Sequence, residues 1–254
     1  MFGVKDLFTT INVVGGAVAI CLCVDGRPYA AGIAVMLGYF LGDTLDGWVA
    51  RKLNSANEFG AEFDTIADHT AHVIAPAAIV YTVYKDAGLV AEPWGRVLAM
   101  ALAASMIVTV SIRHARNIVA PVSFKGIWTG LPRTVFGFLA IGYVNAKLAP
   151  DLPGGLWLGV FLIPFMGIAT LTYWPFPSHH IVRPLFLWVR IGIVSFFVVP
   201  LAVAILRPAY FFDVLFFWMA GYSLLGWAAF TPEERATHRA KVAAARATLQ
   251  STPG

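Results

Sequence analysis

The feature that most constrains the fold is a series of apolar segments, each long enough to cross a lipid bilayer. A membrane-spanning helix needs roughly 17–25 mainly apolar residues. Short polar or Pro/Gly-containing turns separate eight such segments: 7–24, 28–53, 59–84, 93–117, 130–148, 156–174, 185–206 and 210–230. The pattern predicts an all-α, polytopic integral membrane helix bundle with about eight transmembrane helices.

The composition supports lipid as the solvent of this chain. Hydrophobic residues make up 59% of it and charged residues 13%, whereas soluble domains carry about 25% charged residues. The net charge of +4 does not indicate a nucleic-acid partner, because the basic residues gather at the ends of apolar segments and form no continuous basic face. No cleavable signal peptide is evident at the N-terminus. Cys21 and Cys23 would point to different faces of a helix, so we expect packing roles and no disulfide.

The distribution of lysine and arginine predicts the orientation of the bundle. With eight spans, most basic residues fall on one side, which the positive-inside rule makes cytoplasmic. These residues are Lys5, Arg51, Lys52, Arg113, Arg116, Lys125, Arg133, Arg183, Arg190 and, in the tail, Arg235, Arg239, Lys241 and Arg246. The other side keeps Arg27, Lys85, Arg96, Lys147 and Arg207. We therefore expect a protein of the cell inner (cytoplasmic) membrane, with both termini and the active site on the cytoplasmic side.

The chain divides into a membrane domain, residues 1–230, and a cytoplasmic C-terminal tail, residues 231–254. Thr231 and Pro232 resemble the start of a helix, an N-cap followed by proline at the first helical position, and acidic residues follow in the first turn. We expect a short, exposed helix in the tail.

Acidic residues concentrate between the second and third apolar segments. Asp43, Asp46, Gly47 and Ala50 lie at helical offsets 0, 3, 4 and 7, which share one face, and Arg51 adjoins that face. The small residues on it leave room for a bulky ligand.

The third segment begins with a second acidic face. Gly60, Asp64, Asp68 and His72 are each four residues apart and therefore align on one helix face. Two neighbouring helices would bring four carboxylates together, and these would repel one another unless cations neutralised them. Oxygen ligands without a Cys/His cluster favour hard cations. We expect two divalent cations, Mg²⁺ or Mn²⁺, which could bridge a diphosphate.

Two other roles are open to these acids: buried ion pairs, and the lining of a transport path. A non-catalytic membrane transporter is therefore kept as a remote alternative. The spacing of the residues favours an enzyme. The pattern Asp43-x2-Asp46-Gly47-x2-Ala50-Arg51-x8-Gly60-x3-Asp64-x3-Asp68 resembles the signature of the CDP-alcohol phosphotransferase family at every fixed position.

The resemblance implies a metal-dependent membrane enzyme that joins an acceptor hydroxyl to the β-phosphorus of a CDP-alcohol and releases CMP. It assigns metal binding to Asp43, Asp46, Asp64 and Asp68, with Asp68 also the catalytic general base. It assigns CDP binding to Gly47, Ala50, Arg51, Gly60 and Asn12. It also implies a possible homodimer.

Segments in and around the signature resemble the phosphatidylserine synthase branch: residues 7–16, 59–68, 113–117, 130–132 and 175–178. The implied reaction is phospholipid biosynthesis, the transfer of a phosphatidyl group from CDP-diacylglycerol to L-serine, giving phosphatidylserine and CMP. Residues 69–73 and Thr134 depart from that branch. Choline, which would give phosphatidylcholine, and inositol phosphate or glycerol phosphate therefore remain alternative acceptors.

Arg113, Arg116 and His72 are candidates for binding the acceptor or a lipid phosphate. The competing interpretations are a topology-setting or snorkelling role for the arginines and a buried packing role for the histidine. His179, His180 and Arg183 are interpreted as loop residues, and Trp94, Trp128 and Trp174 as interfacial anchors.

Overall fold

The computed structural model describes residues 3–45, 57–122, 124, 126–178 and 186–251, and these are almost all helical. The elements of the first half are α1 (Val4–Val24), α2 (Pro28–Gly38), the π-helical turn η1 (Tyr39–Asp43), α4 (Glu58–His69), the π-helical turn η2 (Thr70–Ile74), α5 (Ala75–Lys85) and α6 (Trp94–Val119). The elements of the second half are β1 (Ile127–Thr129), α7 (Arg133–Asn145), η3 (Ala149–Asp151), α8 (Leu156–Leu171), β2 (Pro175–Pro177), α9 (Leu187–Leu206), η4 (Pro208–Tyr210), α10 (Phe211–Leu225), η5 (Gly226–Ala229) and α11 (Pro232–Ser251). The predicted all-α architecture is confirmed.

Helix α7 is the centre of the bundle. Every residue from 136 to 144 is buried, because α2, α5, α8 and α10 all contact this helix. A helix that is apolar on all sides and has neighbours on all sides is a core helix. Its far end is fixed by Asp213 of α10, whose carboxylate accepts hydrogen bonds from the backbone N–H of Lys147 (3.0 Å) and Leu148 (2.6 Å).

Helix α1 packs closely on its neighbours because its contact face carries small residues. A Cβ added to Gly16 would lie 2.9 Å from the Cα of Ala71 in η2. On another part of α1, the Cβ of a residue replacing Gly15 would lie 2.8 Å from the backbone oxygen of Ala34. Small residues let helix backbones approach in this way within membranes, where van der Waals packing replaces the hydrophobic effect.

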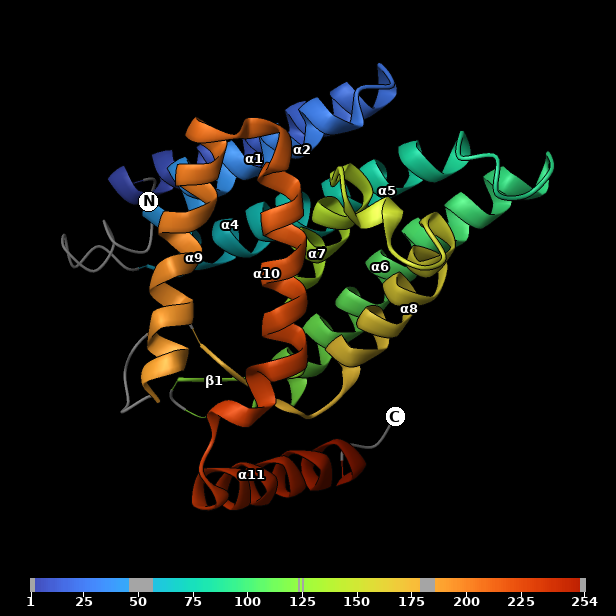
Figure 1. The fold of residues 1–254 in the computed structure, drawn as a ribbon. Coiled ribbons are helices and arrows are strands. Elements are labelled where there is room, and N and C mark those ends of the chain that lie inside the picture. Colours follow the sequence, from blue (N-terminus) through green and yellow to red (C-terminus); the bar gives the residue numbers. More distant parts are fainter. Residues whose placement is uncertain (1–2, 46–56, 123, 125, 179–185, 252–254) are drawn as a thin grey trace.

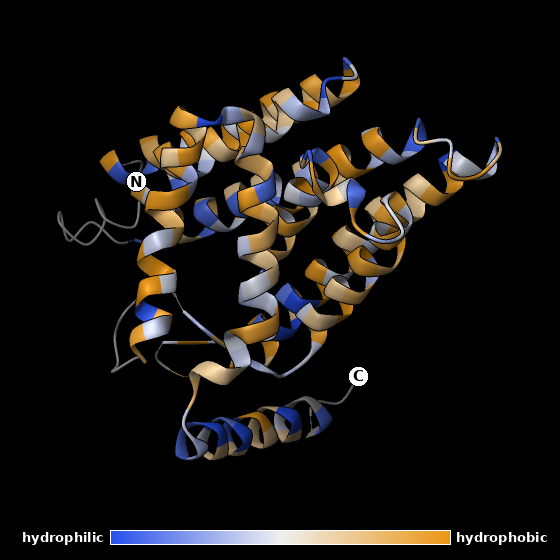
Figure 2. Cartoon of the chain, in the orientation of Figure 1, coloured by the Kyte–Doolittle hydropathy of each residue, from blue (hydrophilic) through white to orange (hydrophobic). Residues whose placement is uncertain are grey.

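The outer surface is apolar, which identifies an integral membrane protein. On α9 the exposed residues recur at helical spacing: Leu187, Ile191, Val194, Val198, Leu201 and Ile205 are between 55% and 73% exposed. A soluble monomer rarely exposes an apolar stripe of this length to water. Four helical segments of the described chain are long and apolar enough to cross a membrane: Val4–Val24, Trp94–Val119, Leu187–Leu206 and Pro208–Ala229. In Figure 2 apolar residues predominate along most helices of the bundle, whereas α11 is largely hydrophilic.

The end of the bundle that holds β1 and β2 carries the only strands among the described residues. They pair antiparallel, Ile127 with Pro177 and Thr129 with Pro175, and thereby tie the loop before α7 to the loop after α8. Helix α11 lies across this end (Figure 1).

The tail helix is longer than expected, and one face of it is covered. Its start is as predicted: the Thr231 hydroxyl accepts from the N–H of Glu234 at 3.2 Å, and Glu234 accepts from the N–H of Thr231 at 2.9 Å. The helix continues for 20 residues, however, and His238, Val242 and Ala245 are buried. The expectation of an exposed tail was wrong on this face, because alanine-rich periodicity alone does not reveal whether a helix docks on its own bundle.

Candidate functional site

The site is built first from η1 and α1. Gly42 of η1 lies directly on α1, since a Cβ there would be 2.6 Å from the backbone nitrogen of Asn12 and 2.7 Å from the oxygen of Phe8. This contact brings the half-buried Asp43 next to Asn12 on α1. A π-helical turn widens the helix by one residue and often occurs at a functional site.

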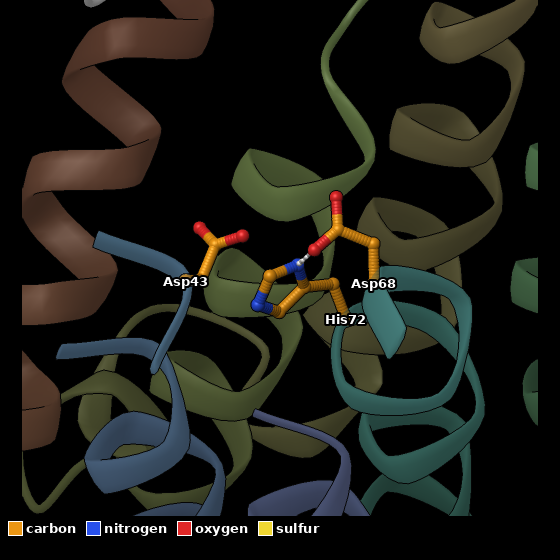
Figure 3. Close-up of side chains that lie close together, drawn as sticks. All are labelled: Asp43, Asp68 and His72. Carbon is orange, nitrogen blue, oxygen red and sulfur yellow. Dashed lines mark ion pairs between the residues drawn. The ribbon is translucent and has the colours of Figure 1, made fainter. Parts of the chain in front are cut away.

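Asp68 and His72 enter from the second acidic face, on α4 and η2. The Asn57 side chain caps α4 by accepting a hydrogen bond from the N–H of Gly60 at 2.7 Å. This cap fixes the residue at which the helix begins. One turn separates Asp68 from His72, and their side chains pair, with His72 Nδ1 3.3 Å from Asp68 Oδ1. His72 is thus a buried residue beside Asp68, and its role toward the acceptor or a lipid phosphate stays a prediction. Figure 3 shows the imidazole between the carboxylates of Asp43 and Asp68.

Two further side chains converge on Asp68 from distant parts of the sequence. Asn12 Nδ2 of α1 donates to Oδ1 at 3.3 Å. Arg133 Nη2, at the first residue of α7, donates to Oδ2 at 2.5 Å. With 13% of its side chain exposed, Asp68 is held by donors from three elements, which neutralise and orient the carboxylate.

The chain reaches Arg133 through a sharp turn. Gly130 has φ of +73°, a left-handed conformation that glycine adopts readily, and a Cβ there would overlap the backbone oxygen of Thr172 at 2.7 Å. Pro132 then precedes α7 as its N-cap in an extended conformation. The sequence indicates Arg133 as a cytoplasmic cation but does not reveal its pairing with Asp68, because no local pattern joins residues 65 positions apart.

The acidic cluster suits a hard cation. Ligand atoms of Asp43, Asp68 and His72 lie within 4.8 Å of one another, so two carboxylates meet a single ring nitrogen in a partly buried place. Asp64, half-buried one turn before Asp68, is not part of this cluster. Asp46, Gly47, Ala50 and Arg51 lie outside the described residues. The donors present fit a divalent cation, because carboxylate oxygens are its preferred ligands.

A cavity of about 720 Å³ leads away from the cluster. Asp43, Tyr39 and Thr134 line part of it, and most of the remaining wall is aromatic and aliphatic, from α7, α9 and α10. Thr134 Oγ1 also lies 3.4 Å from His72 Nδ1. The site thus joins a charged cluster to a long apolar space.

On the α1 side, the N-terminal turn covers Gly60. Lys5 Nζ pairs with Asp6 Oδ1 at 3.4 Å, both residues are buried, and a Cβ on Gly60 would overlap the Lys5 amine. The sequence indicated Lys5 only as a cytoplasmic cation, and it gave Asp6 no role. Only the hydrophilic character of both, at the head of an otherwise apolar helix, could have indicated them.

The structure separates the two arginines that sequence analysis treated alike. Arg116 is engaged by the end of α8: Nη1 donates to the backbone oxygen of Leu171 at 2.6 Å, and the guanidinium lies over the Tyr173 ring at 4.5 Å. Arg113 is buried and donates from Nη2 to Thr129 at 3.3 Å. Within the described part of the chain its Nε has no hydrogen-bond partner.

The structure describes some of the remaining candidate residues. Trp94 is 64%, Trp128 39% and Trp174 59% exposed, and their placement at a membrane interface stays a prediction. Cys21 and Cys23 are free cysteines. His179, His180 and Arg183 lie outside the described residues.

The fold and the site define a class: an integral membrane protein whose acidic cluster opens onto an apolar cavity, suited to a charged lipid. The sequence profile of the CDP-alcohol phosphatidyltransferase family matches residues 3–174. The chain belongs to this family, and the match covers the elements from α1 to α8, including every described residue of the acidic cluster.

Curated relatives are named for serine transfer. The chain is 37% identical over 83 residues to the archaetidylserine synthase of Methanothermobacter thermautotrophicus, which covers 32% of this chain and 35% of that one. It is 35% identical over 127 residues to the CDP-diacylglycerol–serine O-phosphatidyltransferase of Helicobacter pylori, covering 48% and 50%. The enzyme of that name from Mycobacterium bovis is 26% identical over 159 residues, covering 62% and 53%. The chain thus matches about a third to a half of the length of these relatives.

Proposed function

We propose that this protein transfers a phosphatidyl group from CDP-diacylglycerol to L-serine, giving phosphatidylserine and CMP. The observation that carries the proposal is the convergence of Asp43, Asp68 and Arg133 beside a cavity whose remaining wall is mostly aromatic and aliphatic. A substrate that fits both parts has a charged phosphate group joined to acyl chains. Family membership and the names of the curated relatives supply the reaction type and the acceptor.

The diacylglycerol part of the substrate would occupy the cavity between α7, α9 and α10. The diphosphate would then lie near Asp43 and Asp68, and the nucleotide on the side of Asn12 and Gly60, with Gly47, Ala50 and Arg51. Asp43, Asp46, Asp64 and Asp68 would hold two divalent cations, Mg²⁺ or Mn²⁺. When bound, these ions supply positive charge that neutralises the diphosphate and stabilises CMP as the leaving group.

Asp68 is the general base of the proposed reaction. Its carboxylate takes the proton of the serine hydroxyl, the serine oxygen forms a bond to the β-phosphorus, and the bond from that phosphorus to the oxygen of CMP breaks. Asn12 and His72 fix the orientation of the carboxylate through Oδ1. Arg133, held against Oδ2, keeps Asp68 ionised between turnovers and lies where negative charge develops.

Arg113 is the proposed anchor of the serine carboxylate. It is buried, its Nε is without a hydrogen-bond partner in the described chain, and the positive charges of Arg116 and Arg133 both act on it. A guanidinium in positive surroundings favours an anion such as a carboxylate. Choline carries no carboxylate and would gain nothing from this arrangement.

We also propose the number of membrane crossings, the orientation and the oligomeric state, from the apolar segments, the basic residues and the family resemblance. The chain crosses the inner (cytoplasmic) membrane eight times, with the shorter helices α2–η1, α4–α5, α7 and α8 completing the four long spans. The active site and both termini face the cytoplasm, and the protein acts as a homodimer, as the family resemblance implies.

The test is CMP release from CDP-diacylglycerol by the purified protein, with serine, choline, inositol phosphate or glycerol phosphate supplied separately, each with Mg²⁺, Mn²⁺ or excess chelator. We expect release with serine in the presence of either metal and none in the chelator. Release with a different acceptor would reject serine while keeping the reaction type, and no release under any condition would reject the enzymatic proposal.

A further inference from the structure

A second cavity, of about 790 Å³, lies between the segment that follows α8 and one face of α11. Its walls come from two short stretches: Leu171, Thr172, Tyr173 and Trp174 on one side, and His238, Arg239, Val242, Ala243, Arg246, Ala247 and Gln250 on the other. Most of the helical wall lies beyond residues 3–174, the part of the chain that matches the family.

The charge of this cavity is positive. Arg239, Ala243 and Arg246 recur at helical spacing and therefore share a face, and the small side chain between the two arginines leaves space between their guanidiniums. No acidic residue is among the residues that line the cavity. The described residues thus place two cations against one hollow, without a carboxylate in its wall to neutralise them.

A third guanidinium, that of Arg116, contacts a residue of the cavity wall. Arg116 and Arg246 lie over the same Tyr173 ring, at 4.5 Å and 4.4 Å from its centroid. These cation–π contacts fix the two positive groups without neutralising them. A planar guanidinium held in this way keeps N–H donors for the oxygens of a phosphate.

The cavity also continues a lipid-facing surface. Phe161, Phe165 and Ile168 recur along the outer face of α8 and are 70%, 59% and 60% exposed. This stripe leads to Leu171, where the cavity begins, and Trp174 at its edge is 59% exposed. In Figure 1 the C-terminal end of α8 approaches the part of α11 nearest the C-terminus.

We propose that this cavity binds the phosphate headgroup of an anionic membrane phospholipid, with Arg239 and Arg246 on the phosphate and the acyl chains along the outer face of α8. The charge favours an anion, and the adjoining apolar stripe favours an anion that carries acyl chains over a soluble one. The bound lipid holds α11 against the end of the bundle that carries β1 and β2. This binding site is separate from the Asp68 site and does not depend on the proposed reaction.

The test is retention of lipid by the full-length protein, purified without CDP-diacylglycerol and measured by native mass spectrometry after exposure to phosphatidylglycerol or phosphatidylcholine. We expect the protein to retain phosphatidylglycerol preferentially. Arg239→Gln and Arg246→Gln should each weaken retention about fivefold, the effect of one basic residue near an anionic lipid surface. Lys241→Gln is the matched control, because Lys241 carries the same charge on the same helix but lies over Phe124 at 4.9 Å.

A second variant tests whether the space between Arg239 and Arg246 matters independently of their charges. Ala243→Leu leaves every charge in place but fills the gap between the two arginines, and it should weaken retention of phosphatidylglycerol as well. An unfolding temperature in detergent equal to that of the unaltered protein shows that each variant is folded. Equal retention of both lipids by the unaltered protein would overturn the proposal, as would equal losses in Arg239→Gln and Lys241→Gln. Competition by free glycerol phosphate at the lipid's own concentration would assign the cavity to soluble phosphates and overturn it too.

Discussion

At the scale of single residues, the site depends on what surrounds Asp68. Its two oxygens receive donors from α1, η2 and α7, so this carboxylate has one orientation and a compensated charge in a partly buried place. This fixed orientation is what the general base of the proposed reaction requires. Removing the charge would leave the neighbouring Arg133 without its counterion as well.

The first prediction follows from this environment. Asp68→Asn should lower the rate of CMP release by about 10²–10⁴-fold, the usual contribution of a positioned general base, because an amide cannot take the acceptor's proton. Glu62→Gln is the control: Glu62 is exposed on the same helix and should release CMP at the unaltered rate. Comparable activity of the two variants would show that Asp68 is not the base.

The second prediction concerns the acceptor. Arg113→Gln should raise the KM for serine by about 10–100-fold, which corresponds to one charge-assisted hydrogen bond, and should change the KM for CDP-diacylglycerol little. The measurement is CMP release with each substrate varied in turn. A rise confined to CDP-diacylglycerol would place Arg113 on the lipid phosphate.

The acidic cluster could be predicted from the sequence only in part, and the limit is physical. Asp68 and His72 are one helical turn apart, so the spacing alone aligned them. The donations from Asn12 and Arg133 join residues separated by 56 and 65 positions. Such contacts depend on how the helices pack, which periodicity does not encode.

At the scale of elements, the two π-helical turns shape the site. Tyr39 of η1 and His72 of η2 contact each other edge to face at 5.7 Å, and both turns lie against α1. The sequence predicted continuous helices here, since a single inserted residue leaves the apolar pattern almost unchanged. The position of Asp43 therefore depends on how closely η1 approaches α1.

The third prediction tests that approach. Gly42→Ala would place a Cβ within 2.6 Å of the Asn12 backbone, where no flexible side chain can yield. We expect a loss of about 1–3 kcal/mol of stability and lower CMP release, read from thermal unfolding in detergent and from the assay. Gly221→Ala, with nothing within 4 Å of the added Cβ, is the control for the unfolding temperature alone, because Gly221 lines the cavity between α7, α9 and α10. An unchanged unfolding temperature in Gly42→Ala would contradict the close contact.

The fourth prediction is that docking of α11 depends on pH. His238 is buried and its Nε2 lies 3.1 Å from the Thr129 hydroxyl; burial lowers the pKa of this imidazole below its ordinary value. The undocked helix therefore binds the proton more readily than the docked one. Docking is strongest above the ordinary histidine pKa of about 6.5 and weakens as the pH falls below it.

Hydrogen exchange of residues 232–251 measures this effect. Exchange should be faster at about pH 5.5 than at about pH 7.5, after correction for the intrinsic rate. His238→Gln keeps a hydrogen-bonding group beside Thr129 and should remove the difference. Equal protection of the unaltered helix at both pH values would show that His238 does not control docking.

At the scale of the whole molecule, the part that matches the family does not by itself enclose the apolar cavity. The match ends at residue 174, yet α9 and α10 supply much of the cavity wall. The lengths of the apolar segments predicted α9 and α10, because an apolar run of about 20 residues is typical of a membrane-spanning helix. Their placement against α7 could not be predicted, because lipid-facing and cavity-facing residues are equally apolar.

The fifth prediction is the topology of the whole chain. If α2–η1, α4–α5, α7 and α8 complete eight crossings, Glu58 and Ala240 lie in the cytoplasm, while Asp86 and Asp151 lie on the opposite side. All four residues are exposed, so each can be replaced by cysteine in a background carrying Cys21→Ser and Cys23→Ala. A membrane-impermeant maleimide added to whole cells should label the cysteines at 86 and 151 alone, and permeabilised cells should label all four. A protein with only the four long spans would place residues 86 and 151 on opposite sides of the membrane, because α6 alone would cross between them, and would label only one of the two in whole cells.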